Sequence, residues 1–136
     1  MTNSGKMTPA VSHSDGVWRL RDSVLAAVNG TMAALAGVGG VISAMEVIAG
    51  ADAEGRAAAG YFAVRAVVIA LAVLILAIKA IASRRPGPLP VVLLGAAAVQ
   101  FADVPISILA GNSAVAIAAF VLGAVHLTTA WLLRRR

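Results

Sequence analysis

The sequence predicts an all-α membrane protein, a four-transmembrane-helix antiparallel bundle with both termini in the cytoplasm. Composition, the spacing of the apolar runs and the placement of charge all support this class. Of the 136 residues, 60% are hydrophobic and only 12% are charged, whereas about a quarter of the residues of a soluble domain are charged. The few charged residues gather in short patches between long apolar runs, which is typical of a polytopic membrane protein.

Four apolar runs define the predicted helices. They cover residues 24–49, 58–82, 90–110 and 113–133. Each run is about 20 to 26 residues long, enough to cross a hydrocarbon core of about 30 Å at a rise of about 1.5 Å per residue. The connections "GADAEGRA", "SRRPGPL" and "GN" contain the glycines and prolines that end helices. Because the last connection is so short, we expect the third and fourth helices to be antiparallel neighbours.

The basic residues predict the orientation. One side of the membrane receives Lys6, Arg19, Arg21, Arg84, Arg85, Arg134, Arg135 and Arg136. On the other side only Arg56 lies outside the membrane, next to Asp52 and Glu54. The excess of Lys and Arg on cytoplasmic segments therefore predicts a multi-pass plasma-membrane protein with cytoplasmic termini. Residues 1–16 are polar and rich in Ser and Thr, so we expect a disordered tail followed by a membrane domain at 17–136.

Composition also narrows the chemistry. The chain has no cysteine, which excludes disulfides, thiolate catalysis and cysteine-ligated metals. Its net charge of +5 comes from residues that flank the helices rather than from a basic and aromatic module, so no nucleic-acid partner is expected. No metal or cofactor is expected either. The expected partners are the lipid bilayer, a lipophilic small molecule and, as a further candidate, a second copy of the chain.

Three charged residues lie inside the apolar runs at similar depth. Glu46, Arg65 and Asp103 are each within about 6 to 11 Å of the outer boundary. An ionisable side chain inside the membrane costs about 2.5 to 3.5 kcal/mol, so we expect the three to face one another, with Arg65 bridging both carboxylates and one carboxyl holding a proton. Gln100 and Tyr61 complete the predicted ligand-binding layer, and the candidates for catalysis are Asp103, Glu46 and Arg65.

A second polar site is predicted nearer the cytoplasm, where Asn29 and His126 lie at similar depth. His126 is either a proton relay or ligand, or a core histidine bonded to a threonine or a carbonyl, and the second interpretation is favoured. Pro105 is expected to kink the third helix and to release the carbonyl of Phe101. Small residues of the first run predict close helix packing; they are Gly30, Ala33, Ala34, Ala36, Gly37, Gly40 and Ala44.

The segments "YFAVRAVVIALAVL", "QFADV" and "GAVHLTTAWLLRRR" resemble the DoxX-like small integral membrane proteins. The resemblance covers roughly residues 24–135. It implies a four-helix membrane fold in which Arg65, Asp103 and His126 match recurring polar positions of that family. Because many of these proteins have no assigned function, the resemblance implies no particular activity.

Three functions agree with these features. The first is a membrane protein that binds a lipophilic molecule or acts as an accessory subunit, with a purely structural ion-pair network as its simplest form. The second is a membrane enzyme that uses Asp103 and Glu46 as acid and base on a lipophilic substrate, in epoxide opening, isomerisation or cyclisation. The third is a small proton-coupled exporter of the multidrug type, although the middle of the first run carries no carboxylate.

Overall fold

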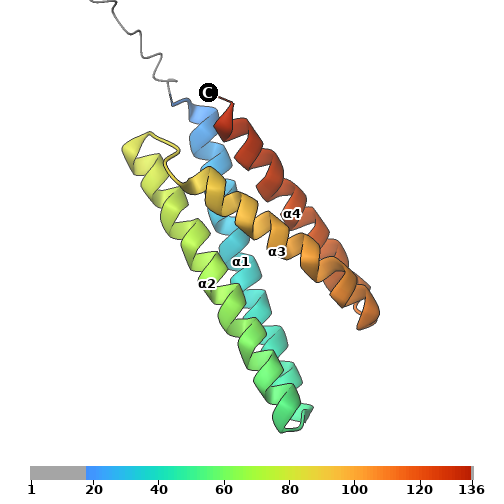
Figure 1. The fold of residues 1–136 in the computed structure, drawn as a ribbon. Coiled ribbons are helices and arrows are strands. Elements are labelled where there is room, and N and C mark those ends of the chain that lie inside the picture. The colour runs from blue at the N-terminus through green and yellow to red at the C-terminus, as the bar shows by residue number, and fades with distance from the viewer. Residues whose placement is uncertain (1–17, 136) are drawn as a thin grey trace, which may run out of the picture.

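The structure is a computed structural model that describes residues 18–135, so the tail predicted at 1–16 lies outside the described residues. The described chain forms a bundle of four helices (Figure 1): α1 (Leu20–Gly50), α2 (Ala53–Ser83), α3 (Leu89–Leu109) and α4 (Ser113–Arg134). All four are long and apolar enough to cross a membrane. The predicted all-helical class with four apolar helices is therefore confirmed.

The first two helices are longer than their apolar runs because polar residues form their first turns. α1 begins at Leu20, where the Asp22 carboxylate accepts the backbone N–H of Arg19 at 2.8 Å. α2 begins at Ala53, where the Asp52 carboxylate accepts the backbone N–H of Gly55 at 2.8 Å and so caps the helix. At about 1.5 Å per residue, α1 and α2 are about 46 Å long and α3 and α4 about 32 Å.

Small residues bring α1 and α2 into close contact, as the sequence predicts. A Cβ atom added to Gly37 would lie 2.7 Å from the Cβ of Ala70, and one added to Gly40 would lie 2.9 Å from the Cβ of Ala66. Both separations are shorter than ordinary van der Waals contact, so the backbone of α1 approaches α2 this closely only because these residues are glycines.

The second helix pair is also packed around a glycine. A Cβ atom on Gly123 of α4 would lie 3.1 Å from the ring of Phe101 of α3. The Phe101 ring meets that of Phe120 edge-to-face at 5.8 Å between centroids, a favourable arrangement for two aromatic rings. The bundle therefore consists of two tightly packed helix pairs, α1 with α2 and α3 with α4.

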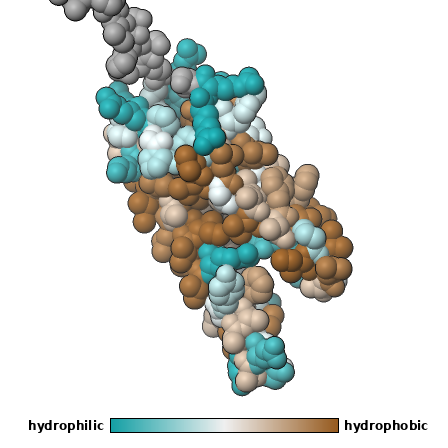
Figure 2. Space-filling model, viewed as in Figure 1, coloured by the Kyte–Doolittle hydropathy of each residue, from teal (hydrophilic) through white to brown (hydrophobic). Residues whose placement is uncertain are grey.

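The two helix pairs share a core only toward one end of the molecule. The core residues are Ala26, Ala33, Val73, Ala77, Ala80, Leu89, Leu93, Ala96, Ala130 and Leu133. All lie in the half that contains the start of α1, the α2–α3 connection and the end of α4. Toward the other end the helix pairs diverge (Figure 1). Figure 2 shows hydrophilic surface at the end that contains the chain termini and at the tip of the α1–α2 pair, an apolar belt between them and a hydrophilic patch within that belt.

Candidate functional site

A cleft lies between the helix pairs at the level where their shared core ends. Its volume is about 50 Å³, and all four helices contribute to its walls. The part of the wall provided by α1 and α2 consists mainly of small residues, namely Ala33, Ala36, Gly37, Ala66 and Ala70. The cleft therefore exists where short side chains meet diverging helices, and four polar side chains also line it: Arg65, Gln100, Asp103 and His126.

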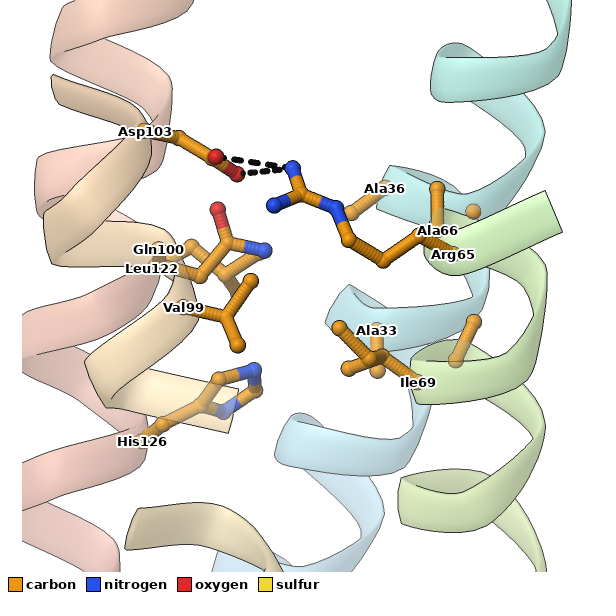
Figure 3. A pocket seen from close by; sticks show the side chains of 12 residues that line it. Ala33, Ala36, Arg65, Ala66, Ile69, Val99, Gln100, Asp103, Leu122 and His126 are labelled. Carbon is orange, nitrogen blue, oxygen red and sulfur yellow. Dashed lines mark hydrogen bonds and ion pairs between the residues drawn. The ribbon is translucent and has the colours of Figure 1, made fainter. Parts of the chain in front are cut away.

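A salt bridge links the two helix pairs across this cleft. Nη2 of Arg65 on α2 lies 2.7 Å from each carboxylate oxygen of Asp103 on α3, as Figure 3 shows. The side chains are 28% and 19% exposed, respectively, so the pair is largely shielded from solvent. The Arg65 guanidinium also lies 5.1 Å from the centroid of the Phe62 ring, close enough for a cation–π interaction.

Hydrogen-bonding capacity remains beside this salt bridge. Within residues 18–135, Nε and Nη1 of Arg65 make no hydrogen bond, and neither does the side-chain amide of Gln100. Figure 3 shows Gln100 between the salt bridge and His126 on the same wall of the cleft. The site therefore offers donors from the guanidinium, and both a donor and an acceptor from the amide.

His126 lies on the same wall of the cleft as Gln100 and is held by a buried network. Its Nδ1 lies 2.6 Å from Oδ1 of Asn29. The Nδ2 of Asn29 donates to the carbonyl of Leu25 and to Oγ1 of Thr129, both at 2.8 Å. These two donations identify Oδ1 as the acceptor, so Nδ1 of His126 carries the hydrogen. Asn29, His126 and Thr129 are 0%, 1% and 2% exposed, and the network joins α1 to α4.

The predicted three-residue ion network is only partly present. The structure brings Arg65 and Asp103 together, but Glu46 is exposed and is not part of the cleft. The physical reason is rotation about the helix axis. Glu46 comes nine positions after Gly37, which at about 100° per residue places it about 180° away from the face that packs on α2. The salt bridge therefore has a formal charge of zero instead of the −1 expected for three groups.

Two other predicted features also lie outside the cleft. Tyr61 is 68% exposed and meets the ring of Phe62 at 6.0 Å between centroids. Pro105 is exposed, lies within α3, which runs on to Leu109, and is not among the residues that line the cleft. Thr129, which also accepts a hydrogen bond from Asn29, was not predicted from the sequence. Its position one helical turn after His126 is the signal that points to it.

The remaining chemistry of the site is simple. Among the described residues, no group of three His, Cys, Asp or Glu side chains comes together at a spacing that suits a metal ion. The arrangement presents one neutralised carboxylate, guanidinium and amide hydrogen-bonding groups, and a buried imidazole at the edge of an apolar cleft. In comparisons with known proteins, no family model matches the chain, and no curated protein or solved structure matches it either.

Proposed function

We propose that this protein is a plasma-membrane protein, an antiparallel four-helix bundle that binds a lipophilic small molecule in the cleft between its helix pairs. The observation that carries the proposal is the Arg65–Asp103 salt bridge. It spans the two helix pairs where their packing ends, and its remaining donors adjoin a cavity. Polar side chains that converge on a concave apolar site are the usual features of a small-molecule site. The membership in the DoxX-like family remains a prediction.

The placement of charge supports cytoplasmic termini. The α2–α3 connection carries Arg84 and Arg85, and it lies at the same end of the molecule as the end of α4 (Figure 1). The α1–α2 connection at the opposite end contains Asp52 and is followed by Glu54 and Arg56. An excess of arginine at one end is what the positive-inside rule associates with the cytoplasmic side.

Binding agrees better with this site than the catalytic and transport hypotheses do. Acid–base chemistry with two carboxylates needs a second acid beside Asp103, and Glu46 faces away from the cleft. A proton-coupled exporter needs a carboxylate that exchanges protons with its cavity, whereas both oxygens of Asp103 are occupied by hydrogen bonds from Arg65.

Photolabelling of the protein in lipid nanodiscs tests the proposal. The probes are hexadecanol and hexadecyl methyl ether, each carrying a diazirine next to its polar end. We expect labelling to concentrate on cleft residues such as Val99 and Leu122 rather than on Ile117, which is 65% exposed. Labelling that is spread over the lipid-facing surfaces of all four helices would contradict the proposal.

A matched pair of variants on α1 provides the control. Ala36 lines the cleft and is half-buried, so Ala36→Leu fills the cleft and is expected to remove most of this labelling. Ala27 is exposed on the same helix, so Ala27→Leu makes the same change of side chain outside the cleft. We expect Ala27→Leu to leave the labelling pattern unchanged. Equal labelling of the two variants would contradict a role for the cleft.

A further inference from the structure

The imidazole of His126 has one nitrogen that no residue of the described chain satisfies. The side chain is 1% exposed, and its Nδ1 is occupied by Asn29. Within residues 18–135, Nε2 makes no hydrogen bond, while the ring itself lines the cleft and points into it (Figure 3). The residue is buried and its free nitrogen faces the cleft, so Nε2 takes its hydrogen-bond partner, a water or a bound molecule, from whatever occupies the cleft.

The network behind His126 determines what that partner must be. Because Oδ1 of Asn29 can only accept, it holds the hydrogen of the ring on Nδ1. In the neutral ring, Nε2 is then a hydrogen-bond acceptor and needs a donor from the cleft. The Asn29 amide already donates to Leu25 and Thr129, and an amide does not pass protons on. The network therefore fixes the orientation of the ring and does not form a proton pathway.

The salt bridge that spans the cleft determines the charge of the partner. Arg65 and Asp103 neutralise each other at 2.7 Å, so an anion would meet the carboxylate and a cation would meet the guanidinium, each inside a largely apolar site. An uncharged polar group avoids both penalties. The cleft volume of about 50 Å³ corresponds to roughly three or four water-sized groups. The cleft therefore has room for the polar end of a lipophilic molecule, and the apolar remainder of that molecule would lie outside it.

Starting from the proposed function, we infer that the molecule bound in this cleft is an uncharged lipophilic alcohol or phenol, whose hydroxyl donates its hydrogen to Nε2 of His126. Arg65 and Gln100 remain free to donate to the same hydroxyl oxygen. Asn29 is a positioning residue, because it holds the ring in the tautomer that accepts. A lipophilic ether, ester or ketone lacks the hydrogen that Nε2 needs and should bind less well.

Nitrogen-15 NMR of the imidazole in lipid nanodiscs tests this inference directly. The chain contains two histidines, so His13→Ala leaves His126 as the single imidazole. We expect the one-bond N–H coupling on Nδ1 and none on Nε2 before any probe is added. Hexadecanol should then shift the Nε2 resonance, whereas hexadecyl methyl ether should not. A hydrogen on Nε2, or equal shifts of the Nε2 resonance with the two probes, would overturn the inference. No shift with either probe would also overturn it, because water rather than a lipophilic alcohol would then be the partner of Nε2.

Affinity measurements with the same probes test the positioning role. Loss of one buried hydrogen bond corresponds to about a tenfold preference for hexadecanol over the ether. Asn29→Leu removes the group that fixes the tautomer and should abolish this preference. Thr129→Val is the matched control, because it disturbs the same buried network but leaves the contact between Asn29 and His126 in place. The preference should persist in Thr129→Val, and its loss there would count against the inference.

The two proposals can fail separately. If both probes label the cleft but bind equally and leave Nε2 unchanged, the protein still binds lipophilic molecules and only the requirement for a hydroxyl is wrong. If neither probe labels the cleft, the proposed function is wrong and the inference falls with it. Should Asn29→Leu fail to fold, the tautomer and the Nε2 response of the protein that carries only His13→Ala still decide the question.

Discussion

Removing one partner of the Arg65–Asp103 salt bridge should destabilise the bundle far more than removing both. Breaking a fully buried ion pair costs about 3 to 5 kcal/mol, and breaking an exposed pair about 0.2 to 1 kcal/mol. The two side chains are 28% and 19% exposed, which places this pair between those limits. We therefore expect Arg65→Gln and Asp103→Asn each to lower the free energy of unfolding by about 2 kcal/mol.

The double variant should behave differently because it leaves no unpaired charge in the cleft. Its loss of stability should be about 1 kcal/mol, less than that of either single variant, which gives a coupling free energy of about 3 kcal/mol. The measurement is a double-mutant cycle by SDS titration in mixed micelles, followed by the fluorescence of Trp18 and Trp131.

Arg56→Gln makes the same substitution at an exposed position near the start of α2 and serves as the control. We expect it to change the free energy of unfolding by no more than about 0.5 kcal/mol. Effects of Arg65→Gln and Asp103→Asn that add within about 0.5 kcal/mol would refute the reasoning. A loss for Arg65→Gln no larger than that for Arg56→Gln would also refute it.

Two further predictions concern packing and orientation. Gly37→Ala should lower the free energy of unfolding in the same titration by about 1 to 3 kcal/mol, because its Cβ would lie 2.7 Å from that of Ala70. A Cβ atom at Gly39 would meet nothing within 4 Å, so Gly39→Ala should raise the free energy of unfolding by about 0.5 to 1 kcal/mol. If Gly39→Ala destabilised the protein more than Gly37→Ala, the packing of α1 on α2 would be contradicted. Because the chain has no cysteine, an impermeant maleimide should label Ser113→Cys in intact cells and Ser83→Cys only after lysis. Labelling of Ser83→Cys in intact cells would instead place the termini on the outer side of the membrane.

The order and number of the helices follow from the sequence alone. Apolar runs long enough to cross a bilayer, separated by glycine and proline, have few alternatives to helix because backbone groups in lipid must be satisfied within the segment. The first residues of α1 and α2 are harder to predict from the sequence. Asp22 and Asp52 extend α1 and α2 beyond their apolar runs, since a carboxylate in the first turn stabilises a helix irrespective of hydropathy.

Part of the site could also be predicted from residue depth. Arg65 and Asp103 lie on neighbouring helices at similar depth, and the cost of an unpaired charge in lipid makes their contact a sound expectation. The pairing of Asn29 with His126 could be predicted in the same way, from their similar depth in the bundle. The depth of a residue does not determine, however, the direction in which its side chain points around the helix. That direction depends on which face of the helix is buried.

Tertiary packing determines which way each side chain points. Gly37 and Gly40 press one face of α1 against α2, and this contact turns Glu46 outward although its depth matches that of Asp103. Packing also decided that the four helices share a core toward only one end of the molecule, which leaves the cleft, the salt bridge and Nε2 of His126 where the helix pairs separate. The sequence determined which polar groups enter the apolar layer, because hydropathy and helix length are local properties. Their arrangement around the cleft required the structure, because it depends on contacts between residues far apart in the chain.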